Sequence, residues 1–348
     1  MGAAAATVRF EVPDPDHTLR AVRVYQEVMR PRDGPALAYD AGAGAWSGTI
    51  PRPRAWRIEY LLNVQLPDGA WQLMPDPGAG SVAVGPFGAK SVLELPEYRP
   101  PAWLERARAD GLDVGDARRV GLATRRLGTI QALLWTTPGH ARDEELPLLI
   151  ALDGPELVEY ADLLTFLAGQ RPLHAALLAP AHNRSEEYSA SAVFADALRN
   201  EIVPQLFEHV SVPRDRGARI AMGASLGGLA ILHAHRRHPR LFGGLFSLSG
   251  SFFVPRHDVS ERDFAWWARI TRFTRMVHRA SEFPVPIPVA MTVGAVEENL
   301  ANNRQMAASL RRQGYDVTFT EHPDAHNWVS WRDVFDPHLP DLFAKVWG

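Results

Sequence analysis

The stretch "ARIAMGASLGGLAIL", residues 218–232, decides how the rest of the chain is interpreted. Its apolar start is typical of a buried strand, and a helical pattern follows the segment Gly223-Ala-Ser-Leu-Gly227. A serine between two glycines arises readily by chance in a chain rich in glycine and alanine. The strand before it and the helix after it instead indicate a nucleophile elbow, which holds a serine hydroxyl above the carboxyl edge of a sheet.

The glycines have a physical role in such a turn. The serine adopts a strained backbone conformation, and side chains at the flanking positions would collide with the neighbouring strand and helix. The turn also directs the N–H of Leu226, near the helix N-terminus, at the place where an oxyanion would form. We therefore expect Ser225 to be a nucleophile and Leu226 to donate to the oxyanion.

Outward from this stretch, the chain alternates buried strands with amphipathic helices. Apolar runs at 146–154, 174–181, 241–251 and 283–295 predict strands buried on both faces, and residues 118–138 predict a leading hairpin. Helical patterns occupy 191–206, 226–239 and 299–314. This alternation predicts an α/β fold over residues 118–348, with a doubly wound, mostly parallel sheet and helices on both faces.

The first part of the chain has a different pattern. Residues 7–98 contain short alternating runs rich in Val, Ile, Tyr and Trp, separated by Pro, Gly and Asp turn signals. Strands at this spacing predict an all-β sandwich domain over residues 1–98. The Pro-, Arg- and Asp-rich segment 99–117 is interpreted as the linker to the second domain.

Composition excludes several classes of function. The 348 residues carry a net charge of −3 and no cysteine, which excludes disulfides, thiolate metal sites and a cysteine nucleophile. The charge provides no global attraction to nucleic acid or to an anionic membrane. The start "MGAAAATVRF" has no basic region or signal-peptide core, and no apolar run is long enough to span a bilayer. We expect a cytoplasmic protein, with no nucleic-acid or membrane partner.

A serine nucleophile needs a base and a carboxylate that orients the base. In an α/β-hydrolase these follow the serine in the order acid, then histidine, from loops after later strands. Glu297 and Glu298 follow one expected strand, and His322 and His326 follow the next. At least one glutamate is interpreted as a solvated charge, and His322 as a surface histidine. The "HAHRRH" segment, residues 233–238, is interpreted as a solvated helix end rather than a metal site.

Several motifs together resemble the esterase D / enterochelin (ferric enterobactin) esterase family of α/β-hydrolases. They are "LPLLIALDG", the Arg-x-x-Glu-Tyr segment that starts at Arg184, "GASLGG", "VGAVEEN" and "HPDAHNWVSWRDVF". The resemblance covers residues 118–348 and implies that Ser225 is the nucleophile, His326 the base and Glu297 the acid. It also implies a second oxyanion N–H from the loop at Gly154. Where the family often has Gly-Gly before the base, this chain has Asp324-Ala325.

The N-terminal region resembles the early-set, immunoglobulin-like sandwich that precedes enterochelin esterases, and also the carbohydrate-binding-type module of some polysaccharide acyl esterases. A domain that only shapes one side of the pocket is favoured over one that binds sugar.

Substrate specificity is expected from residues 252–282, which are aromatic and basic. An amphipathic helical lid accounts for this composition as well as a site for a flat anionic ligand does. The candidate substrate-binding residues are Trp266, Trp267, Trp328 and Trp331 and, by family resemblance, Arg184. The sequence therefore predicts a serine esterase without a cofactor, acting on a small-molecule ester such as a siderophore trilactone. The alternatives are a general acyl, feruloyl or acetyl-sugar esterase and a non-catalytic binding protein with this fold.

Overall fold

The computed structural model describes residues 7–348. Residues 1–6 lie outside the described residues. They include most of the N-terminal start interpreted from the sequence as lacking a signal peptide. The chain divides into two compact units, and each is described here by itself. The first unit contains residues 7–99 together with Gly294–Glu297 and His322–Asn327, and the second contains the remaining residues.

The first unit is built on two antiparallel sheets. One has the strand order β1-β5-β4 and the other has β3-β2-β6-β9-β8, with β7 paired to β6. Side chains alternate between buried and exposed along β1, so that Val8, Phe10 and Val12 enter the core between the sheets. The β-rich N-terminal domain expected from the alternating runs is confirmed. Its strands are β1 (Thr7–Pro13), β2 (Ala21–Gln26), β3 (Asp33–Ala36), β4 (Ala38–Asp40), β5 (Ala45–Pro51), β6 (Arg57–Gln65), β7 (Trp71–Met74), β8 (Ser81–Gly85) and β9 (Gly88–Glu94).

The second unit is organised around an eight-stranded sheet with the order β10-β11-β13-β12-β14-β15-β16-β17. The pairs from β13 through β12, β14 and β15 to β16 are parallel, and the hairpin β10–β11 joins β13 in antiparallel fashion. The mostly parallel α/β sheet is therefore confirmed. Its strands are β10 (Arg118–Thr124), β11 (Gly128–Thr136), β12 (Leu148–Leu152), β13 (His174–Leu178), β14 (Arg219–Ala224), β15 (Gly244–Leu248), β16 (Pro288–Gly294) and β17 (Asp316–His322).

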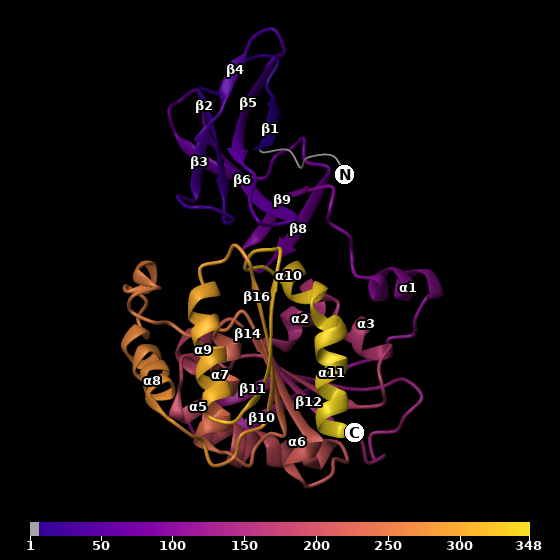
Figure 1. The fold of residues 1–348 in the computed structure, drawn as a ribbon. Helices are drawn as coiled ribbons and strands as arrows, with labels where there is room; N and C mark the ends of the chain where they lie inside the picture. Colours follow the sequence, from indigo (N-terminus) through magenta and orange to yellow (C-terminus); the bar gives the residue numbers. More distant parts are fainter. Residues whose placement is uncertain (1–6) are drawn as a thin grey trace. The chain divides into compact units, whose positions relative to one another are not determined.

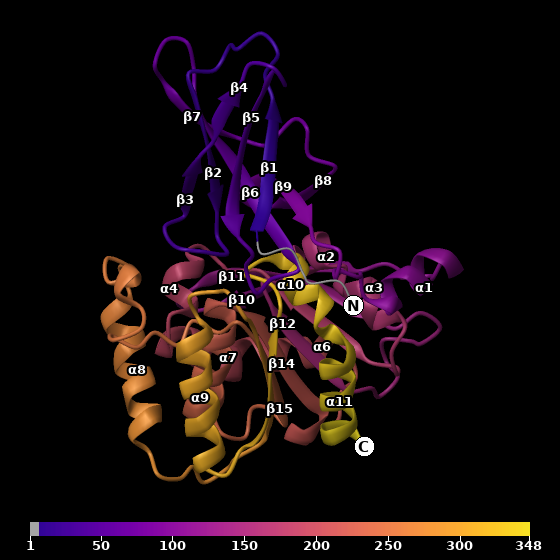
Figure 2. The ribbon, with the colours of Figure 1, turned by 45° about the horizontal axis from the view of Figure 1, so that its top comes forward.

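Helices cover both faces of this sheet, as Figures 1 and 2 show. Alternate residues of β12 enter opposite cores: Leu148 and Ile150 pack with α5 to α9, while Leu149 and Ala151 pack with α1, α2, α3 and α11. The helices are α1 (Ala102–Asp110), α2 (Gly154–Ala161), α3 (Leu163–Ala168), α4 (Arg184–Tyr188), α5 (Ala192–Ala197), α6 (Val203–His209), α7 (Leu226–Arg237), α8 (Trp267–Arg279), α9 (Leu300–Arg312), α10 (Trp328–Asp333) and α11 (Phe335–Trp347). A π-helical turn, Leu198–Ile202, joins α5 to α6.

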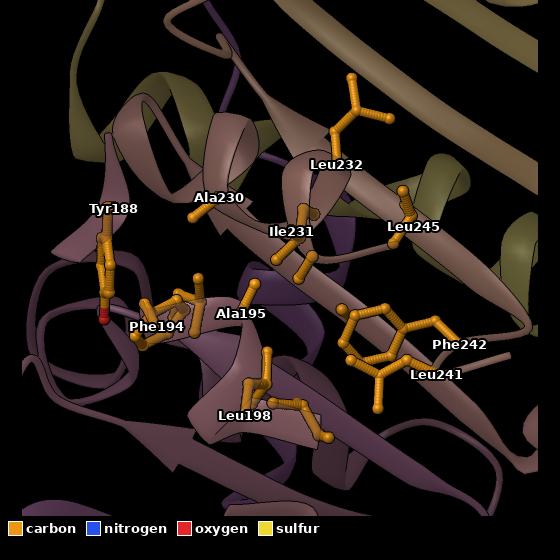
Figure 3. Close-up of a cluster of buried hydrophobic side chains, with 14 of the residues drawn as sticks. Tyr188, Phe194, Ala195, Leu198, Ala230, Ile231, Leu232, Leu241, Phe242 and Leu245 are labelled. Carbon is orange, nitrogen blue, oxygen red and sulfur yellow. The ribbon is translucent and has the colours of Figure 1, made fainter. Parts of the chain in front are cut away.

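Figure 3 shows part of the first of these cores, where Phe194 and Leu198 from the α5 region meet Ile231 of α7. Phe242 and Leu245, from the segment leading into β15, close the same cluster. These side chains hold α7 against the sheet and so fix the position of the turn that precedes it.

Some segments differ from the sequence-based expectation. The segment interpreted as a linker contains α1, whose Trp103 and Leu104 are buried in the core beside α3. The interpretation of residues 233–238 as solvated is wrong for His235, which is fully buried against the rings of Phe283 and Tyr315. Burial, and then the nearby Arg236, lower the pKa of His235 to about 3, so this imidazole is neutral at pH 7.

No helix among the described residues has both the length and the apolar character needed to cross a membrane.

In the first unit, the carboxylate of Asp14 lies in a cluster of donors. It accepts hydrogen bonds from the Trp46 indole at 2.9 Å, from Thr18 and from the Leu19 N–H. Burial acts to raise the pKa of Asp14, but these hydrogen bonds outweigh it and lower that pKa to about 2.

We expect Asp14→Asn to lower the free energy of unfolding by about 1–3 kcal/mol at pH 7, because charge-assisted hydrogen bonds are lost. A depressed carboxyl pKa stabilises the fold above the unfolded pKa near 4, and this stabilisation fades as the pH falls toward 2. Urea unfolding at pH 7, 5 and 3.5 should therefore show a shrinking difference from the wild type. Glu11→Gln, in an exposed pair with Arg9, is the control. A difference that does not change with pH would contradict the prediction.

Candidate active site

Ser225 occupies the sharp turn between β14 and α7. Its backbone has φ 57° and ψ −119°, a conformation that a residue with a side chain adopts only at a cost in free energy. The Ser225 N–H donates to the carbonyl of Leu248 at 2.8 Å, and the Ser225 carbonyl accepts from the Ser251 N–H at 3.0 Å. Both polar groups of the strained residue are thus held by β15 and the segment that follows it.

The neighbouring glycines are required by close backbone approach. A Cβ on Gly223 would lie 2.6 Å from the backbone carbon of Gly227, and one on Gly228 would lie 2.6 Å from Ser247 Oγ. Gly223 and Gly228 therefore let α7 start immediately after the strand, whereas a Cβ on Gly227 would lie no closer than 3.4 Å to any atom outside its own helix, so the collision expected at that flank is not found.

Two backbone donors stand beside each other at this edge of the sheet. Leu226 and Gly154 are the first residues of α7 and α2, where an N–H has no acceptor within its own helix. The preceding strands, β14 and β12, are adjacent and parallel. A Cβ on Gly227 would lie only 3.4 Å from Asp153 Oδ2, so the two turns are close neighbours. This arrangement can hold a negatively charged oxygen.

Arg184 is paired with Asp153, the residue before Gly154. Its Nε and Nη2 donate to the two carboxylate oxygens at 2.7 and 2.6 Å, and the Asp153 side chain is only 2% exposed. The turn that carries Gly154 is therefore braced by a bidentate ion pair. Arg184 is expected from the sequence to contact the substrate. In the structure its guanidinium is hydrogen-bonded to Asp153.

Glu297 and His326 meet in the first unit. The Nδ1 atom of His326 lies 2.7 Å from Glu297 Oε2, and Glu297 Oε1 accepts from the Gly294 N–H at 3.0 Å. The Glu297 side chain is 1% exposed, whereas that of His326 is 29% exposed. A carboxylate at Nδ1 favours the tautomer with its proton there, which makes Nε2 the basic nitrogen of the ring. The neighbouring Glu298 is exposed at the surface.

The four tryptophans have different environments. Trp331 is buried and its indole donates to Ser249 Oγ at 3.1 Å, while Trp328 packs edge-on against it with ring centroids 4.9 Å apart. Trp267 stacks on Phe253, and the Trp266 ring lies under the Arg269 guanidinium. Trp331 is thus a core residue, and the other three are half-buried.

The helix expected within the aromatic and basic segment is α8. Its buried face includes Ile270, Phe273 and Val277, and Arg269 donates to backbone carbonyls of Ser189 and Glu186. Amphipathic packing therefore accounts for much of the composition of residues 252–282.

Ser251 is a site residue that the sequence analysis did not single out. Its hydroxyl lies 3.1 Å from Ser225 Oγ, and its side chain is buried. Its place just after a buried strand is the only signal in the sequence, and many structural serines share such a place.

Within residues 7–348, no three His, Asp or Glu side chains gather in the way that ligands of a metal ion do.

Comparison with known proteins places residues 135–342 in a family. The family model described as "Putative esterase" matches residues 135–342. The iron(III) enterobactin esterase of Escherichia coli O6:H1 is 27% identical over 337 residues, which cover 88% of this chain and 81% of that protein. The iron(III) enterobactin esterase of Dickeya dadantii is 28% identical over 212 residues, covering 57% of this chain and about half (48%) of that relative.

The fold is also found among solved structures. The enterobactin esterase of Shigella flexneri, solved in the presence of enterobactin, superposes with a TM-score of 0.76 at 20% identity, covering 97% of this chain and 93% of that one. At this identity the likeness concerns the fold alone, and it extends over both the β-rich domain and the α/β domain.

We expect Arg184→Met to lower the free energy of unfolding by about 3–5 kcal/mol, because it leaves the buried Asp153 carboxylate without its partner. Arg237→Met is the matched control: Arg237 forms a similar bidentate pair with Asp196, but both side chains are about 40% exposed. The control should cost less than about 1 kcal/mol. Chemical denaturation measures both. A stable Arg184→Met variant with weakened substrate binding would instead show that Arg184 contacts the substrate.

Proposed function

The chain belongs to the esterase family, a family of carboxylic-ester hydrolases, and we propose that it acts as a serine esterase with Ser225 as nucleophile, His326 as general base and Glu297 as the acid. The observation that carries the proposal is the strained turn at Ser225. Backbone strain at a residue with a side chain persists only where the surrounding structure enforces it, and such positions cluster at active sites. The strained residue directly precedes α7, and the turn that begins α2 is a close neighbour of that helix start.

The strand order supports bringing the three residues into one site. Ser225 follows β14, and the turn with Glu297 follows β16, which is parallel to β14 through β15. Chain segments that leave the carboxyl ends of parallel strands emerge at the same edge of a sheet. The order serine, acid, histidine along the chain is that of α/β-hydrolases.

The proposed reaction has two acyl-transfer steps. His326 Nε2 takes the Ser225 proton as Oγ attacks the ester carbonyl, and the Leu226 and Gly154 N–H groups stabilise the oxyanion. His326 then gives the proton to the leaving alcohol, and the acyl group stays on Ser225. Water, deprotonated by His326, then attacks the acyl-enzyme, and His326 returns the proton to Ser225 Oγ as the acid is released. Glu297 orients the imidazole and stabilises the imidazolium.

For the substrate, we propose a siderophore ester of the trilactone class. The names of the E. coli and Dickeya relatives, which are iron(III) enterobactin esterases, support this assignment. The half-buried Trp266 and Trp267 and the arginines of α8 would suit a flat, anionic aromatic ligand. In this proposal the ferric ion is part of the substrate.

Replacing the catalytic residues tests the mechanism. We expect Ser225→Ala and His326→Ala each to lower kcat for p-nitrophenyl acetate by about 10⁴-fold or more, because the pair acts as a unit. Glu297→Gln should cost about 10²–10⁴-fold, since the imidazole loses its orienting charge. Glu298→Gln, the exposed neighbour, should retain activity within about twofold. A His326→Ala variant that keeps most of its rate would rule out this residue as the base.

Competing substrates test the specificity. We expect kcat/KM for ferric enterobactin to exceed that for feruloyl and acetyl sugars by about 10²-fold or more, because several ring contacts contribute to binding. Chromatography of the ring-opened products at matched enzyme concentration gives the ratios. Ser225→Ala should still bind ferric enterobactin, measured by quenching of tryptophan fluorescence. Comparable turnover of all three classes would favour a general acyl esterase.

A further inference from the structure

The first compact unit combines the N-terminal sheets with two short segments from the far end of the chain. Gly294–Glu297 carries the proposed acid, and His322–Asn327 carries the proposed base. We call them the acid loop and the base loop. The acid loop's Val296 and the base loop's Ala325 both pack against the apolar core between the N-terminal sheets. The dyad is thus built on the β-rich domain.

Polar contacts hold the base loop to the start of β6. The Trp56 N–H donates to the carbonyl of Pro323 at 2.7 Å. Next to it, Arg57 Nη1 donates to Asp324 Oδ2 at 3.3 Å, and the two side chains are 3% and 8% exposed. Arg57 also lies 3.5 Å from Glu59 Oε1 and over the ring of Tyr98. The guanidinium is therefore a buried charge held in one position.

Asp324 connects Arg57 to the residues on either side of His326. Its other oxygen, Oδ1, accepts from the Ala325 N–H at 2.7 Å and from Asn327 Nδ2 at 3.1 Å, so it binds both neighbours of the histidine. The two loops also interlock: the Ala295 N–H donates to the His322 carbonyl, and a Cβ on Gly294 would lie 2.3 Å from the Asp324 carbonyl oxygen. Movement of Asp324 would shift His326 relative to Glu297.

We propose that Arg57 is a positioning residue for catalysis, which acts through Asp324 to hold His326 in its productive orientation. The inference rests on the proposed function, because it matters only if His326 is the base. It gives the N-terminal domain a part in the chemical step, beyond covering one side of a pocket or binding a sugar.

The expected effect follows from geometry. Removing the guanidinium breaks the bond to Asp324 Oδ2 and removes the positive charge beside this buried carboxylate, so the base loop relaxes toward water. A displacement of about 1 Å in a reacting group costs on the order of 10²-fold in rate. Substrate contacts elsewhere are unchanged, so the loss should fall on kcat and not on KM.

The test uses the full-length chain with p-nitrophenyl acetate. Arg57→Met should lower kcat by about 10–100-fold with KM within about twofold, and the rate at which a fluorophosphonate labels Ser225 should fall in parallel. A purely structural role would lower the amount of folded enzyme without changing either rate per folded molecule. Arg52→Met is the matched control, since Arg52 forms a more exposed pair with Glu97 in the same domain. It should keep the wild-type kcat.

Two further variants make the result decisive. Arg57→Lys keeps a charge but cannot bridge Glu59 and Asp324 in the same way, so it should recover part of the lost kcat. Asp324→Asn keeps a neutral acceptor at Oδ1 but puts an NH₂ donor in place of Oδ2, which accepts from Arg57, so that bond is lost and kcat should fall several-fold. If Arg57→Met does not fold, Asp324→Asn decides the question.

The two proposals fail in different ways. Wild-type kcat and labelling rates in Arg57→Met, or in Asp324→Asn where the first variant does not fold, would overturn the positioning role if His326→Ala is inactive. Full activity in His326→Ala would instead overturn the proposed function itself.

Discussion

The turn at Ser225 depends on a constraint that its own residues cannot supply. A positive φ at a serine is maintained only because the Ser225 N–H and carbonyl are both bound by residues at the end of β15. That segment is held in turn by α9, where Asn299 donates to the Ser249 carbonyl and Asn303 to the Gly250 carbonyl. These amides are buried, so the hydrogen bonds are costly to break. Buried amide side chains at the start of α9, about 75 residues later in the chain, thus help to hold the strained turn in place.

Two Arg–Asp pairs, each with a buried carboxylate, have related roles in the two units. Arg184 braces Asp153 at the turn that presents Gly154, and Arg57 braces Asp324 in the loop that presents His326. In both cases the carboxylate belongs to the segment with the functional group and the guanidinium comes from a different element. A buried ion pair adds little to stability compared with apolar packing, but it fixes position closely. Such pairs suit places where orientation matters more than stability.

The sequence predicted best what depends on local pattern. The strands β12, β14 and β15 are buried along their whole length, so their continuous apolar runs were easy to recognise. The elbow was recognisable because its glycines and its strand–helix context lie within 15 residues. Burial of His235 was not, because the apolar rings around it come from Phe283 and Tyr315, far along the chain. The partner of Arg184 was missed for a similar reason: nothing near Asp153 in sequence indicates a bidentate pair. The packing of the acid and base loops on the N-terminal sheets likewise leaves no periodic signal.

The bond between Arg57 and Asp324 joins residues separated by 267 positions. During synthesis the N-terminal sheets emerge from the ribosome first, with part of their apolar core uncovered and with Arg57 lacking its bond to Asp324. The two loops that complete this domain arrive only when the chain is almost finished. Contacts of such long range form late and slow the final stage of folding. A nascent or truncated chain would therefore contain the Ser225 turn before Glu297 and His326 are held together by the N-terminal sheets.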